Sequence, residues 1–272
     1  MSRAAAFFDL DNTIISGSSV FYFGLAAWRD GMIPTGQLVR DGWNNVTFKL
    51  FGASDEGSEA IRDRILEAVA GVEQSRLIGL TEQIIPRVLQ KVRPEAKGLL
   101  DMHAAAGRDR YLISASPVEL VAEVAKDLGL EGGIGTESEV DASGCYTGNL
   151  VGPFTYGPGK AEAIEKLAAE KGYDLRLSYA YSDSASDLPM LEMVGHPVAV
   201  NPDSALESVA HQRGWPIVVF ARRTKLVVKT TTAVTGAIGL ATGTYLLGRR
   251  HGRIQAEAAG LRDLLARRVR LR

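Results

Sequence analysis

The apolar positions along this chain repeat with two periods, one typical of strands and one typical of helices. Uninterrupted apolar runs, beginning with Ala4–Phe8, indicate strands that are buried on both faces. From Pro94 onwards such runs alternate with stretches of helical period, which predicts a doubly wound parallel α/β sheet with helices on both faces. The elements expected there are strands over 110–114, 177–181 and 197–200, helices over 94–106, 118–128 and 159–171, and a β-hairpin within 136–150.

The long segment between the first strand and Pro94 lacks this alternation. Its apolar positions have helical spacing, and glycine or proline separates one helical stretch from the next. The helices expected in it are 20–28, 37–51, 56–70 and 74–92. We therefore predict an inserted helical module, or cap, over residues 16–91, and an α/β core built from residues 1–15 and 92–222.

The C-terminal part, residues 223–272, has a different composition. Residues 230–247 are 18 uncharged positions between basic residues, a length at the lower limit of a membrane-spanning helix. Gly239 and Gly243 have the spacing of membrane helix pairs. The abundance of Thr and Gly is equally compatible with a helical tail that packs on the globular domain or in an oligomer. Membrane association through residues 226–248 and a packed helix therefore both remain open.

The net charge of −1 combines an acidic main part with a basic end. Residues 249–272 contain eight arginines and two acids, which suits an anionic cytoplasmic leaflet or an exposed helix. The near-zero total does not favour nucleic-acid binding, and 46% hydrophobic content is typical of a globular protein. Cys145 is the only cysteine, and the early apolar run leaves no room for a signal peptide. We expect a cytoplasmic protein, free or anchored at the cytoplasmic face of the membrane.

Two acids, Asp9 and Asp11, follow the first apolar run directly. The carboxyl ends of parallel strands are where α/β sheets bind ligands. Two neighbouring carboxylates repel each other unless a cation or a proton lies between them. The pair therefore predicts a metal site, a nucleophile with an acid/base partner, or both.

Four features occur in order along the chain, each at an expected strand end or helix start. They are Asp9-x-Asp11-x-Thr13, Ser114, Lys160 and the pair Asp183…Asp187. This set resembles the haloacid dehalogenase (HAD) superfamily of phosphohydrolases, over about residues 4–205. The long spacing between the first two features is similar to that of members with a helical cap inserted there, the phosphoserine phosphatase-like branch (subfamily IB). The resemblance implies a Rossmann-like core and phosphatase activity.

The resemblance also implies a role for each residue. Asp9 would be the nucleophile that forms an aspartyl-phosphate, and Asp11 would protonate the leaving oxygen and then activate water. Thr13 would orient the loop or Asp11 through its hydroxyl, as part of the phosphate-binding group. Ser114 would donate to a phosphoryl oxygen, and Lys160 would pair with the phosphate and with Asp9.

A magnesium site is expected from the same resemblance. Mg²⁺ prefers oxygen ligands and is held by one or two carboxylates together with phosphate. The ligands would be the carboxylates of Asp9 and Asp183 and the backbone carbonyl of Asp11. Asp187 would lie further out, on a metal-bound water or on Lys160.

The cap is expected to select the substrate. Phosphoserine phosphatases carry a Glu just after the first motif that binds the substrate ammonium, whereas residues 12–29 of this chain contain no acid and Ser16–Ser19 stand there. This argues against phosphoserine and leaves a small-molecule or lipid-linked phosphate. Polar cap residues that could reach a substrate are Arg40, Asn44, Asn45, Lys49, Arg62 and Arg64, and aromatic residues expected in the cap core are Phe21, Tyr22, Phe23, Trp28 and Trp43.

Each site residue also has an ordinary structural explanation when taken alone. Ser114 could cap a helix, Lys160 could be a surface lysine, and the acids could lie in turns. Their combination favours a phosphatase. A phosphotransferase and a membrane-tethered regulatory or binding protein with an idle site are the alternatives. The four histidines (His103, His196, His211 and His251) lack the spacing of a zinc site, and Cys145 is expected to be structural.

Overall fold

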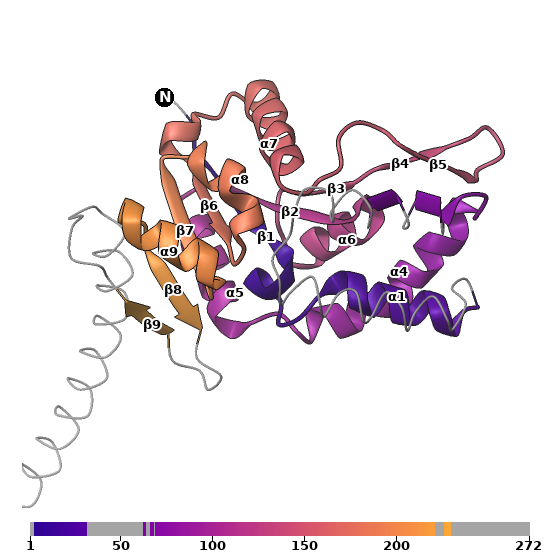
Figure 1. Ribbon diagram of the computed structural model, residues 1–272, viewed down its shortest axis with the longest axis horizontal. Helices are drawn as coiled ribbons and strands as arrows, with labels where there is room; N and C mark the ends of the chain where they lie inside the picture. The colour runs from indigo at the N-terminus through magenta and orange to yellow at the C-terminus, as the bar shows by residue number, and fades with distance from the viewer. Residues whose placement is uncertain (1–2, 32–61, 64–65, 68, 221–225, 230–272) are drawn as a thin grey trace, which may run out of the picture. The chain divides into compact units, whose positions relative to one another are not determined.

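A seven-stranded sheet forms the centre of the computed structural model, which describes residues 3–31, 62–63, 66–67, 69–220 and 226–229 (Figure 1). The strand order is β3-β2-β1-β6-β7-β8-β9, and every neighbouring pair is parallel except β8 and β9. The strands are β1 (Ala5–Asp9), β2 (Asp109–Pro117), β3 (Gly132–Thr136), β6 (Tyr179–Ser182), β7 (His196–Val200), β8 (Ile217–Phe220) and β9 (Leu226–Lys229).

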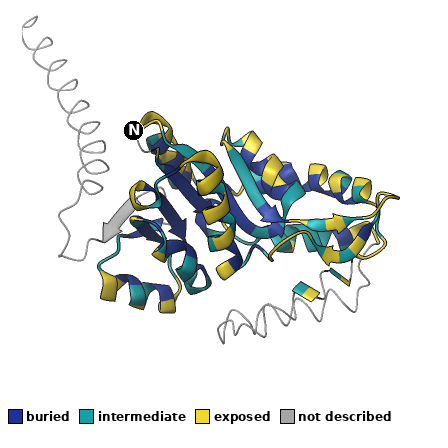
Figure 2. Cartoon of the chain, turned by 90° about the horizontal axis from the view of Figure 1, so that it is seen from above, coloured by how far each residue is buried: buried dark blue, intermediate teal, exposed yellow. Residues whose placement is uncertain are grey.

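Helices cover both faces of this sheet, which confirms the doubly wound fold. All five side chains of β1 are buried, and they alternate between the two faces. Phe7 belongs to a core cluster with residues of α7, α8 and α9, whereas Phe8 on the other face contacts His103 of α5 edge-on. Figure 2 shows the strands largely buried and the outer surfaces of the helices exposed. The helices of the core are α5 (Pro94–Ala105), α6 (Val118–Asp127), α7 (Pro158–Lys171), α8 (Leu188–Glu192) and α9 (Ser204–Arg213).

The two ends of segment 16–91 lie side by side. Ile15 and Val92 form an antiparallel bridge, the N–H of Ser16 donates to the carbonyl of Lys91 (2.9 Å), and the N–H of Arg93 donates to the carbonyl of Ile14 (2.9 Å). This junction is what an insertion into the core requires, and we propose on this basis that residues 16–91 form the cap.

Two expected cap helices are present, α1 (Ser19–Arg29) and α4 (Gln74–Leu89), and they contact each other. The helix expected over 37–51 lies outside the described residues, and the one over 56–70 lies largely outside them. Of the aromatic residues expected in the cap core, Phe21 is 60% exposed, which excludes it from such a core, whereas Tyr22, Phe23 and Trp28 are half-buried and Trp43 lies outside the described residues. The helix instead directs Ser19 and Ala27 inward.

The predicted hairpin is present as β4 (Ser138–Val140) and β5 (Tyr146–Leu150). Its β5 end pairs with the segment before α4, since the N–H of Gly71 donates to the carbonyl of Tyr146 (2.8 Å) and the N–H of Tyr146 donates to that of Val72 (2.9 Å). Cys145 lies in this hairpin as a half-buried free thiol. The hairpin therefore attaches the cap to the core at a second place.

The sheet continues past residue 222, where the core was expected to end. Leu226–Lys229, the first residues of the segment considered for membrane association, form β9 and pair with Ile217–Phe220 of β8. Within the described residues no helix is long and apolar enough to cross a membrane. Residues 230–247 lie outside them, so the rest of that expectation stays a prediction.

Candidate active site

Asp9 is the last residue of the central strand, at the point where the sheet topology reverses. The chain adds β2 and β3 on one side of β1 and β6, β7 and β8 on the other. Such a reversal opens a crevice at the carboxyl ends of the strands, where α/β proteins bind ligands. Asp9 is 6% exposed, so its carboxylate lies inside the protein at this end of the sheet rather than on the surface.

A tight turn over Leu10–Ile14 separates the surroundings of Asp9 from those of Asp11. Asn12 in this turn has a φ of 56°, a left-handed conformation that Asn tolerates better than most residues. Its N–H donates to the carbonyl of Gly17 (3.1 Å), and the N–H of Gly17 donates to its Oδ1 (3.2 Å). The turn thereby brings the start of α1 next to Asp11.

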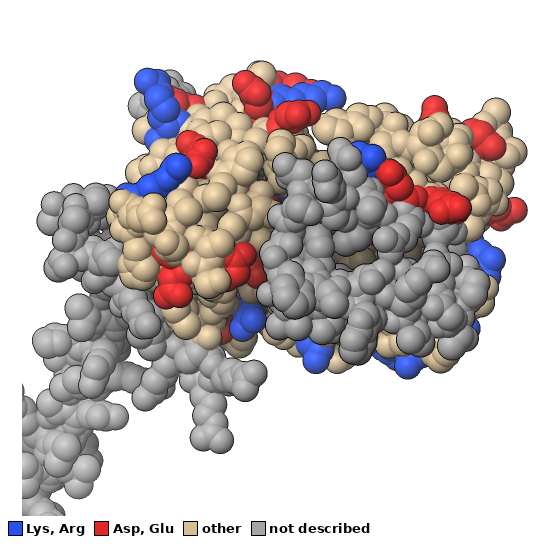
Figure 3. All heavy atoms as spheres, in the orientation of Figure 1, with Lys and Arg blue, Asp and Glu red and all other residues tan. Residues whose placement is uncertain are grey.

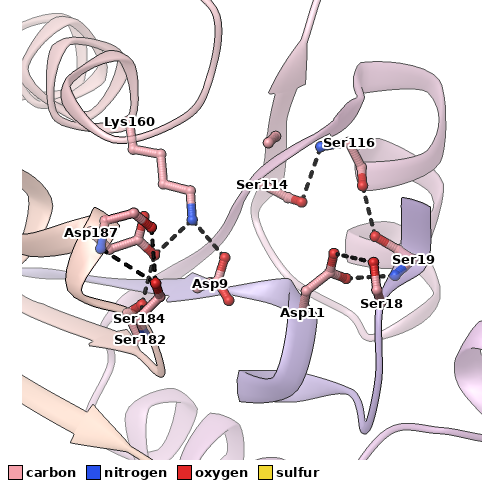
Figure 4. Close-up of polar contacts among 12 residues, drawn as sticks. Asp9, Asp11, Ser18, Ser19, Ser114, Ser116, Lys160, Ser182, Ser184 and Asp187 are labelled. Atoms are coloured by element: carbon pink, nitrogen blue, oxygen red, sulfur yellow. Dashed lines mark hydrogen bonds and ion pairs between the residues drawn. The ribbon is translucent and has the colours of Figure 1, made fainter. Parts of the chain in front are cut away.

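Lys160 bridges two buried carboxylates (Figure 4). Its Nζ donates to Oδ1 of Asp9 (2.6 Å) and to Oδ2 of Asp187 (2.7 Å), and the hydroxyl of Ser182 donates to the same Asp187 oxygen (2.6 Å). Lys160 is 4% exposed. Lys160 is 151 positions from Asp9 and 27 positions from Asp187 along the chain, and the structure brings the three residues together, as the sequence analysis expected.

The sequence before Lys160 explains how a lysine reaches this position. Gly157 has φ 52° and ψ −120°, a conformation open almost only to glycine, and Pro158 begins α7. A Cβ at position 159 would lie 1.9 Å from the carbonyl oxygen of Phe154, so only glycine fits there. These three residues allow the first turn of α7 to lie close to the preceding loop. Lys160, in that turn, is thereby placed beside Asp9.

The loop after β6 carries Asp183 and Asp187, and Asp203 holds it in place. The N–H of Asp203 donates to the carbonyl of Asp183 (2.8 Å), and its Oδ2 accepts from the N–H of Ala185 (3.0 Å). Its other oxygen, Oδ1, caps α9 by accepting from the N–H of Leu206 (2.7 Å). Sequence reasoning missed Asp203, although an acid directly before a helical stretch is a recognisable N-cap signal.

Negative charge is in excess around Lys160. Burial raises the pKa of Asp9 to about 7, an effect that Lys160 reduces and that Asp187 and Asp11 increase. Burial, together with Asp9 and Asp187, raises the pKa of Asp183 to about 8. Burial alone would lower the pKa of Lys160, but the carboxylates of Asp187 and Asp9 outweigh it and hold that pKa above its ordinary value. One lysine thus faces more carboxylates than it can neutralise.

Charge is distributed differently on the surface and in the acidic cluster around Lys160. On the face shown in Figure 3, acidic and basic side chains of the described residues are interspersed rather than separated by sign. The acidic group formed by the buried Asp9 and Asp187 and the half-buried Asp183 differs from this face in its excess of one sign.

Hydroxyl groups, rather than charges, surround Asp11 (Figure 4). Its Oδ1 accepts from the N–H of Ser19 (2.8 Å), and its Oδ2 lies 3.4 Å from the hydroxyl of Ser18. The hydroxyls of Ser19 and Ser116 are 2.7 Å apart, and the N–H of Ser116 donates to Oγ of Ser114 (3.2 Å). Burial raises the pKa of Asp11, and the hydrogen bonds from Ser19 act in the opposite direction.

Thr13 does not form the expected hydrogen bond to Asp11. Its side chain is 1% exposed, and its hydroxyl has no hydrogen-bond partner among the described residues. The turn directs the Asp11 carboxylate towards Ser18 and Ser19 instead, which explains the difference. Of the polar cap residues named above, Arg62 is paired with Asp63 (2.8 Å), and the remaining ones lie outside the described residues.

His103 lies inside the core, next to the strands that carry the site. It is fully buried, and its Nε2 lies 2.7 Å from the hydroxyl of Tyr181, which stacks on Phe8 of β1. Burial and the nearby Arg108 lower the pKa of His103 to about 3, so the imidazole is neutral at ordinary pH. It packs against side chains of β1, which ends in Asp9, and of β6, which precedes Asp183.

Comparison with known proteins agrees with this geometry. The family model of haloacid dehalogenase-like hydrolases matches residues 6–192. The chain belongs to this family, and the expectation of an enzyme of the HAD phosphatase type is confirmed.

Relatives of the chain extend over most of its length. It is 41% identical to the "Inhibition of morphological differentiation protein" of Streptomyces azureus. The match extends over 228 residues, which are 83% of this chain and 82% of that protein. A probable phosphatase of Mycobacterium tuberculosis is 38% identical (92% of this chain, 90% of that protein). A protein of the same organism named phosphoserine phosphatase is also 38% identical (87% and 78%).

Solved structures share the fold. A Bordetella pertussis protein described as having unknown function has a TM-score of 0.69 and 27% identity, covering 80% of this chain and 98% of that one. A substrate-bound phosphoserine phosphatase has a TM-score of 0.57 at 18% identity, covering 76% and 90%. The latter supports the fold alone.

Proposed function

We propose that this protein is a Mg²⁺-dependent phosphomonoesterase that works through an aspartyl-phosphate on Asp9. The observation that carries the proposal is the buried contact between Asp9 and Lys160 at the carboxyl end of the central strand (2.6 Å). A nucleophilic carboxylate must approach a negatively charged phosphoryl group, and a fixed cation between them lowers the repulsion. Asp187 keeps that cation in place from the other side (2.7 Å).

The reaction has two steps in this proposal. A carboxylate oxygen of Asp9 attacks phosphorus in line with the leaving group, so that a bond from Asp9 to phosphorus forms and the bond to the leaving oxygen breaks. Asp11 gives a proton to that oxygen, and the alcohol leaves. Asp11 then takes a proton from a water molecule, whose oxygen attacks phosphorus. The bond to Asp9 breaks, phosphate is released, and both acids return to their starting state.

The phosphoryl oxygens would be held by neutral and charged donors. Ser114 is 2% exposed in the C-terminal half of β2, and its Oγ already accepts a hydrogen bond from the N–H of Ser116, so its own proton is free to donate to phosphate. Lys160 offers the remaining hydrogen of its ammonium group. Thr13, with its buried and unpartnered hydroxyl, is a further donor in this proposal.

The residues present fit a magnesium ion. The described residues contain no group of three or more His, Cys, Asp or Glu side chains placed to hold a metal, but Mg²⁺ needs only one or two carboxylates when phosphate and water complete its shell. Burial and, to a smaller extent, the neighbouring carboxylates raise the pKa values of Asp9 and Asp183, and Oδ1 of Asp187 is buried without a partner among the described residues. Asp9, Asp183 and the carbonyl of Asp11 would hold the ion. When bound, it supplies positive charge for the transferring phosphoryl group.

The nucleophile is the residue on which the proposal can be tested most directly. Asp9→Asn keeps the shape of the side chain and removes its nucleophilicity, so hydrolysis of 4-nitrophenyl phosphate should fall at least about ten-thousand-fold. Asp127→Asn, at the exposed end of α6, is the matched control and should behave like the wild type. Full activity of a folded Asp9→Asn protein would exclude the mechanism, and phosphate retained on an added alcohol would indicate a phosphotransferase.

The substrate is proposed to be a small or lipid-linked phosphate monoester without a required ammonium group. One relative is named phosphoserine phosphatase, but the first turn of α1 in this chain contains no acid, and Ser18 and Ser19 there contact Asp11. Phosphoserine and the same molecule without its amino group should therefore differ in kcat/KM by less than about threefold. A loss of tenfold or more without the amino group would show that an ammonium-binding acid lies elsewhere.

Location at the cytoplasmic face of a membrane stays part of the proposal. It depends on residues 230–272, which lie outside the described residues. A chain that ends after Thr230 retains β9 and so tests the tail without removing a strand. Equal distribution of the full-length and shortened proteins between membrane and supernatant would remove membrane association from the proposal.

A further inference from the structure

The start of α1 and the end of β2 are joined by a buried pair of hydroxyls. Oγ of Ser19 and Oγ of Ser116 are 2.7 Å apart, and both residues are at most 1% exposed. Ser19 is the first residue of α1, in the proposed cap, whereas Ser116 belongs to β2 of the core. A hydrogen bond without access to water is costly to break, because each hydroxyl would be left unpaired.

Each end of this pair is connected to a residue that the proposed mechanism uses. On one side, the backbone N–H of Ser19 donates to Oδ1 of Asp11 (2.8 Å). On the other, the backbone N–H of Ser116 donates to Oγ of Ser114 (3.2 Å). Figure 4 shows the resulting series of contacts running from Ser114 through Ser116 and Ser19 to Asp11. The hydroxyl pair thus determines where the acid lies relative to the phosphate-binding serine.

The contacts of Asp11 also distinguish its two carboxylate oxygens. Oδ1 receives the short hydrogen bond from the N–H of Ser19, whereas Oδ2 lies 3.4 Å from the hydroxyl of Ser18. An oxygen that accepts a short N–H hydrogen bond is a poor place for a proton. Oδ2 is therefore the oxygen available to carry a proton towards a leaving group.

We propose that Ser19 and Ser116 are positioning residues that hold Asp11 with Oδ2 facing the leaving group of the substrate. This inference rests on the proposed function, since it assigns Asp11 the task of proton delivery. It goes beyond that function in naming a contact between cap and core that orients the acid. Neither serine touches the reacting atoms; they act through the backbone N–H of Ser19.

The test compares two substrates that differ in their need for an acid. Phenyl phosphate and 4-nitrophenyl phosphate are similar in size, but phenolate is much the poorer leaving group and gains more from protonation. Ser19→Ala keeps the N–H that reaches Asp11 and removes the hydroxyl that aligns it. We expect kcat/KM, which covers the steps up to departure of the leaving group, to fall about tenfold for phenyl phosphate, as for one lost buried hydrogen bond, and to change less than about twofold for 4-nitrophenyl phosphate.

Two further variants make the result specific to the pair. Ser116→Ala breaks the same contact from the core side, so either variant can serve if the other fails to fold, and the double variant should lose no more than one single variant does. Ser178→Ala is the matched control. Ser178 is equally buried and has two hydrogen bonds, to Ala5 and Asp174, near the amino ends of the strands, away from the site. This control should leave the ratio of the kcat/KM values for the two substrates unchanged.

The outcomes are separable from those of the proposed function. Asp9→Asn decides whether the chain hydrolyses phosphate esters through this site at all. If Asp9→Asn is inactive but Ser19→Ala lowers kcat/KM equally for both substrates, or for neither of them, the hydroxyl pair is structural and the positioning role is excluded. Additive losses in the double variant would exclude it too, because two independent residues would then be acting.

Discussion

Asp9 and Asp11 are separated by a single residue, but their carboxylates contact different kinds of groups. Asp9 faces Lys160, whose ammonium group also holds Asp187, within a cluster made entirely of core elements. Asp11 faces a backbone N–H and a hydroxyl from Ser19 and Ser18, at the start of α1. We refer to Asp9, Lys160 and Asp187 as the charged half of the site, and to Asp11, Ser18, Ser19 and Ser116 as the hydroxyl half.

The difference between the halves corresponds to the tasks proposed for the two acids. A nucleophile has to stay ionised beside a second anion, and a nearby cation favours that state. An acid/base group has to gain and lose a proton, and neutral donors allow both states better than a fixed cation does. The halves also differ in origin: the core alone forms the charged half, whereas the hydroxyl half needs both the core and α1.

Among changes to the surroundings of the two acids, removal of Lys160 should have the largest effect, because it leaves the charged half without a cation. Lys160→Met should lower kcat about a hundredfold to a thousandfold and destabilise the fold by about 3–5 kcal/mol, since buried carboxylates would remain uncompensated. Denaturant unfolding and steady-state hydrolysis of 4-nitrophenyl phosphate measure the two effects. Lys126→Met, whose side chain is 73% exposed, is the control for loss of a lysine.

A second substitution tells the two effects of Lys160 apart. In Lys160→Met/Asp187→Asn one of the buried negative charges is also removed, so part of the lost stability should return while activity stays low. If Lys160→Met is as stable as the wild type, Asp9 and Asp187 do not depend on it as their buried partner. The comparison of the two halves would then have to be abandoned.

Metal removal should reveal the excess negative charge through the pH dependence of stability. The pKa values of Asp9 and Asp183, about 7 and about 8, lie above their ordinary value of 3.8, so between these limits the native state binds more protons than the unfolded state. Stability of the metal-free protein should therefore fall as the pH rises. His103, with its pKa lowered from 6.5 to about 3, has the opposite effect, but only below pH 6.5.

Thermal unfolding in chelator between about pH 6.5 and about pH 8 measures this dependence. Added Mg²⁺ should raise Tm more at the upper end of that range than at the lower end, because protons compete with the ion for the carboxylates. Asp183→Asn should weaken both the pH dependence and the response to Mg²⁺. Stability that rises with pH in chelator, or a response to Mg²⁺ independent of pH, would contradict the assignment of the charge.

The smallest expected effect concerns Asp203, which holds the loop of the charged half from outside. Asp203→Ala removes both of its contacts and should cost about 1 kcal/mol through loss of the helix cap. Asp203→Ser can still cap α9 but cannot also reach the N–H of Ala185, so it should keep most of that stability while Mg²⁺ affinity falls about tenfold. Isothermal titration with Mg²⁺ and unfolding curves separate the two, and equal Mg²⁺ affinity in all three proteins would show that Asp203 serves α9 alone.

Strand β3 was not predicted from the sequence, because glycine occurs both in turns and at positions where another element lies very close to a strand. β3 contains Gly132, Gly133 and Gly135, a composition that indicates a turn rather than a strand. In the structure a Cβ at Gly133 would lie 2.5 Å from the carbonyl oxygen of Val121, and one at Gly135 would lie 2.6 Å from Cα of Val118. These glycines allow α6 to lie directly on the strand, which no local pattern reveals.

The sequence by itself determined the parallel α/β core and placed Asp9, Asp11, Ser114, Lys160, Asp183 and Asp187 at strand ends and helix starts. Such inferences depend on local periodicity and on the rule that parallel strands present their carboxyl ends at one edge. The family resemblance already implied the contact of Lys160 with Asp9, whereas tertiary structure alone decided that Ser19 lies beside Asp11 and Ser116. A serine or an aspartate has many possible partners, and only the packing of distant elements brings one of them within hydrogen-bonding distance.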